Sequence, residues 1–176
     1  DALAEAELIE RLLPLAYVVT PNLAEAEVLA GLSIRDVEEM EQAARRIHAK
    51  GSRHVVVKGG HLAGPPVDVF FDGQVFQYFE GERIETKSLH GTGCTFASAI
   101  AAELAKGAEV TAAVRHAKAY VTAAIRLAEP IGHGFGPTHH FGALYDQAAR
   151  YDIIVQLEEA VTQLRGAGIA ALIPQV

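Results

Sequence analysis

The turn Gly91-Thr92-Gly93-Cys94 constrains the fold more than any other feature, because a run of mostly small residues at 95–105 follows it directly. Glycine permits backbone angles that let several N–H groups converge on one point. The helix predicted after the turn adds unpaired amides and about half a positive charge at its N-terminus. Together these features predict a site for an anion, such as a phosphoryl group in transfer.

Cys94 falls in the first turn of the predicted helix, a position that favours the thiolate form of a cysteine. A thiolate there can accept the proton of a substrate hydroxyl while that hydroxyl attacks phosphorus. The alternative is a glycine-rich helix start with a small buried cysteine and no chemistry. The turn is not a Walker loop, since Gly-x-x-x-x-Gly-Lys-Ser/Thr is absent. The residues alone leave both interpretations open.

Apolar runs of strand length alternate with helical patterns along the first 142 residues. Helices are predicted at residues 1–13, 23–30, from 33 or 36 to 48, and at 95–105 and 110–128. Strands are predicted at residues 16–19 and 54–57, and as a hairpin at 67–71 and 74–79 around Asp72-Gly73. This order predicts an α/β fold with a largely parallel sheet.

From Tyr145 onward the alternation of strand-like runs and helical patterns stops. Residues 152–165 predict an amphipathic helix, with its large apolar side chains on one side: Ile154, Leu157, Val161 and Leu164. We therefore expect a domain boundary near residues 142–150, with residues 1–142 as one unit and residues 143–176 as a linker helix and a further segment. Because the first residue is Asp1 rather than Met, we expect a cut or processed N-terminus.

The formal net charge is −7 and no Lys/Arg-rich run occurs, which argues against nucleic acid or an anionic membrane as the main partner. A single cysteine excludes an intrachain disulfide and favours a reducing compartment. No apolar run approaches the roughly 18–20 residues that span a bilayer. We therefore expect a cytoplasmic protein.

Three further features are candidates for a site. Asn22 and Glu25 lie three residues apart at a helix start, where they can form a capping box or, past the end of a strand, hold Mg²⁺. Lys58 follows an apolar strand and precedes two glycines, so it either reaches solvent or contacts phosphate. The histidines at 133, 139 and 140 lack a cysteine or carboxylate at a zinc-site spacing, which favours a covering loop over a metal site.

Residues 86–100 resemble the signature of the ribokinase-like superfamily, and more closely that of the hydroxymethylpyrimidine/phosphomethylpyrimidine kinases of thiamine biosynthesis. Most ribokinase-like enzymes have an Asp base at the position of Cys94, whereas a Cys is usual in the pyrimidine kinases. Four further segments are similar in the same order: residues 20–27, 55–61, 117–121 and 132–140. The resemblance covers residues 1–142 and implies the C-terminal portion of a ribokinase-like three-layer α/β/α sandwich with a mostly parallel sheet.

The resemblance implies ATP-dependent phosphorylation of hydroxymethylpyrimidine and then of its monophosphate. In such an enzyme Gly91, Thr92, Gly93 and Cys94 form the anion hole, with Cys94 as the base. The metal site for Mg²⁺ would be formed by Asn22 and Glu25. The implied contacts to ATP come from Lys58, Gly60, Lys118 and His133.

The N-terminal half of such a kinase, which carries most of the groups that hold the pyrimidine, is absent from this sequence. We therefore expect that half as a partner, on the same domain or a second chain, together with a homo-oligomer and an exposed sheet edge. Residues 151–176 resemble the opening of a thiamine-phosphate synthase domain, although a generic amphipathic helix explains them as well. Two other functions stay open: a pyridoxal-type vitamer kinase, some of which share the Cys turn, and a non-catalytic nucleotide-binding or assembly module.

Overall fold

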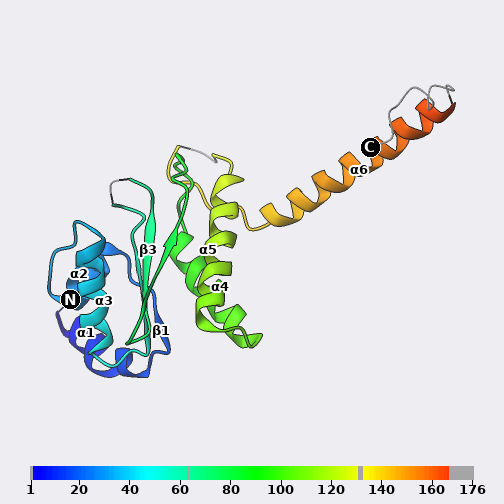
Figure 1. Ribbon diagram of the computed structural model, residues 1–176. Helices are drawn as coiled ribbons and strands as arrows, with labels where there is room; N and C mark the ends of the chain where they lie inside the picture. Colours follow the sequence, from blue (N-terminus) through cyan, green and yellow to red (C-terminus); the bar gives the residue numbers. More distant parts are fainter. Residues whose placement is uncertain (1, 63, 131–132, 167–176) are drawn as a thin grey trace.

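The computed structural model describes residues 2–62, 64–130 and 133–166. Helices pack on both faces of one sheet, which separates α2 and α3 from α4 and α5 (Figure 1). The elements in order are α1 (Ala2–Glu7), a π-helical turn (Leu8–Leu12), a 3₁₀ turn (Leu13–Leu15), β1 (Val18–Val19), α2 (Leu23–Ala30), α3 (Val37–His48), β2 (His54–Lys58), β3 (Val67–Phe71), β4 (Phe76–Glu80), α4 (Thr92–Ala105), α5 (Val110–Arg126) and α6 (Gly142–Gly166).

The sheet has the strand order β1-β2-β3-β4. The predicted α/β/α layering is confirmed, but the described sheet is mixed rather than mostly parallel. Only β1 and β2 pair in parallel, because the hairpin adds two antiparallel pairs, β2 with β3 and β3 with β4. β1 is shorter than predicted and only half-buried, since it lies at one edge and pairs only with β2 among the described residues.

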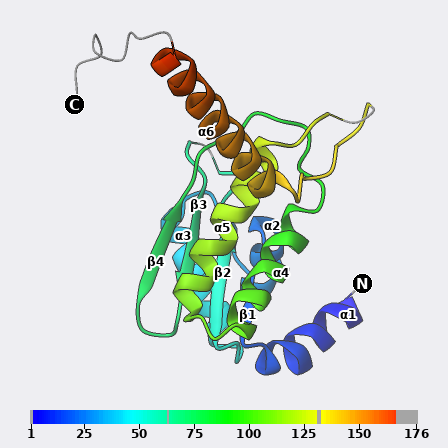
Figure 2. The same cartoon turned by 90° about the vertical axis from the view of Figure 1, so that its right-hand side faces the viewer.

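The side chains of β2 alternate between two core layers. Figure 2 shows the helices that cover them, with α4 and α5 in front of the sheet and α3 behind it. Val55 and Val57 pack with Met40 and Ile47 of α3 on one face, while Val56 packs under α4 and α5 on the other. All three valines are fully buried, which explains why this strand is a continuous apolar run rather than an alternating one. The double covering fixes β2, and therefore Lys58 at its end, between the two helical layers.

Local signals set most element boundaries. Asp36 caps α3 by accepting the Glu39 N–H at 2.8 Å, and Gly31 ends α2 with a positive φ of 64°. In the hairpin, Asp72 Oδ1 accepts the N–H groups of Gln74 and Val75, so four residues separate β3 and β4. The hairpin is therefore confirmed, with β4 beginning two residues later than predicted.

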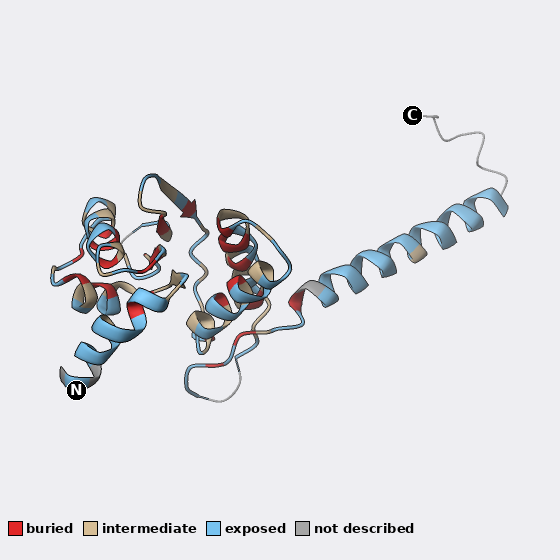
Figure 3. Cartoon of the chain, turned by 90° about the horizontal axis from the view of Figure 1, so that it is seen from below, coloured by how far each residue is buried: buried red, intermediate tan, exposed pale blue. Residues whose placement is uncertain are grey.

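α6 extends away from the rest of the chain and is exposed along nearly its whole length (Figure 3). It runs without a break through the predicted boundary at 142–150, because that stretch is also rich in helix formers such as Leu144 and Gln147. Residues 167–176, which hold the end of the proposed further segment, lie outside the described residues. Among those that are described, no helix is long and apolar enough to span a membrane.

Candidate active site

The end of β2 and the start of α2 meet at one edge of the sheet. The Lys58 N–H donates to the Pro21 carbonyl at 2.9 Å, and Asn22 forms a parallel bridge with Lys58. Open α/β sheets bind ligands at the carboxyl ends of their strands. The parallel pairing of β1 and β2 therefore brings Asn22 and Lys58 together although 36 residues separate them (58 − 22).

Asn22 and Glu25 form a complete capping box. The Glu25 N–H donates to Asn22 Oδ1 at 2.9 Å, and the Asn22 N–H donates to Glu25 Oε2 at 2.7 Å. The capping alternative is therefore confirmed, and the metal role stays a prediction. The second carboxylate oxygen of the exposed Glu25 has no partner among the described residues, so the same pair can still bind a metal through water.

The glycine turn begins α4, which starts at Thr92 rather than near residue 95. Gly91 is its N-cap with a positive φ of 86°, and its carbonyl accepts the Thr95 N–H at 2.9 Å. The N–H groups of Gly93 and Cys94 have no hydrogen-bond partner among the described residues. The turn thus presents the unpaired amides that an anion site needs. Cys94 is exposed and forms no disulfide among the described residues.

Lys58 lies directly against this turn. Its Nζ is 3.2 Å from the position that a Cβ would occupy on Gly93. A groove of about 280 Å³, called the central groove below, lies between them and α5. Six of the predicted site residues line it: Asn22, Lys58, Gly60, Thr92, Gly93 and Lys118. The other four do not line the groove: Glu25, Gly91, Cys94 and His133.

Asp68 of β3 also lines the central groove, and the sequence analysis missed it. Its Oδ2 accepts Lys118 Nζ of α5 at 2.8 Å, and its Oδ1 accepts the Gly59 N–H at 3.1 Å. Both side chains are largely buried, at 12% exposed for Asp68 and 15% for Lys118. One carboxylate in an otherwise apolar, buried strand was the signal that could have identified it.

Arg83 holds the loop that follows β2. Its guanidinium donates to the carbonyl oxygens of Gly60, Leu62 and Gly64. Three carbonyls bound by one planar group keep the turn after Lys58 folded along the rim of the central groove. No local pattern around Arg83 predicts this contact.

The covering loop predicted at residues 132–140, called the closing loop below, contacts the segment before the glycine turn. The His90 N–H donates to the Gly136 carbonyl at 3.1 Å, and the Ser88 hydroxyl donates to the Glu129 carbonyl at 3.3 Å. His133 is exposed, so its predicted nucleotide contact stays a prediction. Gly132 lies outside the described residues.

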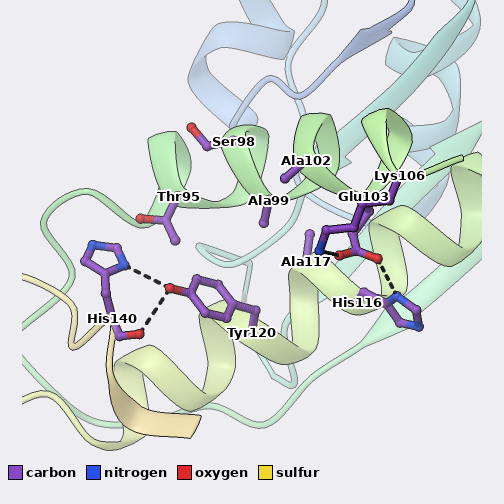
Figure 4. A pocket seen from close by; sticks show the side chains of 10 residues that line it. All are labelled: Thr95, Ser98, Ala99, Ala102, Glu103, Lys106, His116, Ala117, Tyr120 and His140. Atoms are coloured by element: carbon purple, nitrogen blue, oxygen red, sulfur yellow. Dashed lines mark hydrogen bonds and ion pairs between the residues drawn. The ribbon is translucent and has the colours of Figure 1, made fainter. Parts of the chain in front are cut away.

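A second groove of about 370 Å³ runs between α4 and α5 (Figure 4). At one end Glu103 accepts hydrogen bonds from Lys106 at 2.7 Å and contacts His116 at 3.0 Å. At the other end the Tyr120 hydroxyl donates to the His140 carbonyl at 3.2 Å. None of the predicted site residues lines this groove, so the central groove is the candidate site.

The central groove suits a phosphorylated ligand with Mg²⁺ better than a metal held by protein alone. Among the described residues, no three His, Cys, Asp or Glu side chains are grouped to hold a metal ion. Mg²⁺ in phosphate sites takes one or two carboxylates, several waters and phosphate oxygens. Asn22, which lines the groove, and its capping partner Glu25, which lies beside it, offer an amide oxygen and a carboxylate of that kind, and their metal role stays a prediction.

A family model for phosphomethylpyrimidine kinase matches residues 1–139. The chain is 56% identical over 147 residues to the thiamine biosynthesis bifunctional protein ThiED of Geobacter sulfurreducens, covering 83% of this chain and 30% of that protein. It is 54% identical over 142 residues to the hydroxymethylpyrimidine/phosphomethylpyrimidine kinase of Rhizobium meliloti, covering 78% and 53%.

Among solved structures, the ADP complex of Bacillus subtilis pyridoxal kinase matches with a TM-score of 0.77 and 45% identity, covering 80% of this chain and 56% of that chain. This likeness confirms the predicted ribokinase-like fold class. The chain spans about half the length of these two kinases and under a third of the bifunctional relative.

Proposed function

This chain belongs to the phosphomethylpyrimidine kinase family, and we propose that it carries the phosphate-binding and catalytic part of an ATP-dependent kinase. The proposed substrates are hydroxymethylpyrimidine and its monophosphate. The observation that carries the proposal is the position of Lys58, whose Nζ lies 3.2 Å from where a Cβ on Gly93 would be. Among the described residues, neither this ammonium nor the N–H groups of Gly93 and Cys94 have a hydrogen-bond partner. Phosphoryl transfer depends mainly on such positioning and charge stabilisation.

In the proposed reaction the substrate hydroxyl oxygen forms a bond to the γ-phosphorus of ATP. The bond between that phosphorus and the bridging oxygen breaks, and ADP leaves. The exposed thiol of Cys94, as thiolate, accepts the hydroxyl proton. The amides of Gly93 and Cys94, with the positive end of α4, stabilise the charge on the transferred group. In the second phosphorylation a phosphate oxygen of the monophosphate replaces the hydroxyl.

We assign Lys58 and Gly60 to the nucleotide phosphates, since both line the central groove. Mg²⁺ supplies charge neutralisation for those phosphates, and Asn22 and Glu25 are the side chains proposed to bind it. Lys118 lies in the same groove, and His133 is proposed to contact the nucleotide from the closing loop.

The pyrimidine-binding part of the kinase is proposed to come from the same polypeptide or from a second chain. One edge of β1 has no strand partner in the part of the chain that the structure describes, and Leu15 (82% exposed) and Tyr17 (47%) lie near it. Both features support this proposal, because such a surface is suited to strand pairing and apolar contact. Residues 143–176 are proposed to link the kinase to the opening of a thiamine-phosphate synthase domain. A homo-oligomer stays a prediction.

A pyridoxal-type vitamer kinase is the second candidate, favoured by the likeness to Bacillus subtilis pyridoxal kinase. The test is phosphoryl transfer from ATP to hydroxymethylpyrimidine and to pyridoxal, measured in parallel on this chain completed by the rest of the kinase domain. We expect kcat/KM to be at least about tenfold higher for the pyrimidine. A preference for pyridoxal would reverse the assignment, and Mg-ATP binding without transfer to either would indicate a non-catalytic module.

A further inference from the structure

We propose that Asp68 is a charge-balancing residue of the central groove: it neutralises Lys118 and leaves Lys58 as the ammonium that meets the phosphates. The inference rests on the proposed use of ATP. It changes the role of Lys118 from a direct contact to ATP to one half of a structural ion pair.

Asp68 uses both of its carboxylate oxygens inside the protein. A buried carboxylate is strongly unfavourable unless it is paired and hydrogen-bonded. Oδ2 accepts Lys118 Nζ at 2.8 Å and Oδ1 accepts the Gly59 N–H at 3.1 Å. These two contacts therefore give both carboxylate oxygens of Asp68 a partner. Removing Lys118 alone leaves the negative charge of Asp68 unpaired.

These contacts join three elements that surround the central groove. Asp68 belongs to β3, Gly59 belongs to the turn after β2, and Lys118 belongs to α5. The stem of Lys118 is also confined, because its Cε lies 3.0 Å from the position of a Cβ on Gly81. The two opposite charges of the pair therefore lie inside the groove, between the turn at 58–60 and α5.

Two lysines line the central groove, Lys58 and Lys118, and they differ in whether a carboxylate neutralises their charge. Lys118 is paired, whereas Lys58 has no hydrogen-bond or ion-pair partner among the described residues and lies beside Gly93. Asp68 and Lys118 together contribute no net charge. Glu82 also lines the groove, and its carboxylate is paired with Arg126. Among the described residues, Lys58 is therefore the unpaired lysine that faces an anion in this groove, together with the amides of α4.

This charge balance predicts how variants of the two residues differ in their affinity for Mg-ATP. Lys118→Met uncovers the carboxylate of Asp68 beside the anionic nucleotide, which should weaken Mg-ATP binding by about tenfold at low salt. Asp68→Asn keeps an acceptor for the Gly59 N–H and should leave Mg-ATP affinity within about threefold of the parent or raise it. The double variant D68N/K118M removes both charges and should return the affinity to within about threefold of the parent.

The experiment is titration of Mg-ATP into each variant of the chain completed by the rest of the kinase domain, with KM and kcat measured in parallel. Lys106→Met, which removes an exposed ion pair with Glu103 outside the groove, is the matched control and should not change the affinity. Thermal unfolding checks that each variant is folded. If D68N/K118M is unfolded, D68L/K118M replaces it, because an apolar pair often substitutes for a buried ion pair.

A double variant that binds Mg-ATP as weakly as K118M would overturn the proposal, since Lys118 would then contact the phosphates itself. A rescue confined to kcat, without rescue of the Mg-ATP affinity, would overturn it as well. The proposed function fails in a different way: the parent protein itself would not bind Mg-ATP.

Discussion

Replacing Gly59 by alanine tests how tightly the core holds the turn that presents Lys58. A Cβ on Gly59 would lie 2.1 Å from the Val67 carbonyl oxygen and 3.0 Å from Cε of Met40. Since ordinary C···O contacts are about 3.3–3.6 Å, the backbones must separate by about 1.2–1.5 Å. Neither neighbour can move freely, because Val67 is paired with Glu80 in the sheet and Met40 is fully buried.

Two effects of the added methyl group lower the free energy of unfolding: overpacking and the loss of a hydrogen bond. Overpacking a filled site costs about 1–3 kcal/mol, and the displaced Gly59 N–H loses its bond to the Asp68 carboxylate, where a bond to a charged group is worth about 1.5–3 kcal/mol. We therefore expect the free energy of unfolding to fall by about 4 kcal/mol. For a chain of this size that loss corresponds to a decrease in Tm of about 8–16 °C.

Thermal unfolding followed by circular dichroism measures this effect, with Gly60→Ala as the matched control. A Cβ on Gly60 meets nothing within 4 Å, so that variant should keep its Tm or gain slightly from reduced unfolded-state entropy. If Gly59→Ala melts within about 2 °C of the parent, the reasoning about the packed turn is refuted.

Two further predictions concern the hairpin and the start of β2. Asp72→Ala removes the acceptor for the Gln74 and Val75 N–H groups and should cost about 1 kcal/mol in urea unfolding, whereas Asp72→Asn should cost less. These backbone bonds hold the pKa of Asp72 below its ordinary value of 3.8, so its contribution is present above that pH and is lost as the pH falls further. An equal effect of both variants would contradict this role. Burial lowers the pKa of His54 below 6.5, so the unfolded chain binds more protons and stability should fall as the pH drops below that value. His54→Phe should flatten this dependence below about pH 6.5, and an unchanged slope in urea titrations would exclude His54 as its source.

Sequence patterns predicted the parts of the site that depend on neighbouring residues. The capping pair Asn22 and Glu25, the hairpin turn at Asp72 and the glycine start of α4 each form within four residues of chain. Their backbone requirements are local, so residue types at fixed spacing are sufficient to identify them.

The missed features depend on contacts between distant segments. Asp68 and Lys118 are 50 residues apart, and Arg83 reaches carbonyls about 20 residues upstream. Nothing near either residue specifies its partner, because the fold brings the segments together. The sequence could place Lys118 at the site but could not reveal that Asp68 already neutralises its charge.

Turnover of a Cys94→Ala variant tests the central claim most directly, in this chain completed by the rest of the kinase domain. Alanine retains the amides of the α4 start and removes only the proposed base. With hydroxymethylpyrimidine as substrate, we predict a decrease in kcat of about 10²–10⁴. The Mg-ATP dissociation constant should not change, since Cys94 does not line the central groove. An unchanged kcat would contradict the assignment of Cys94 as the base.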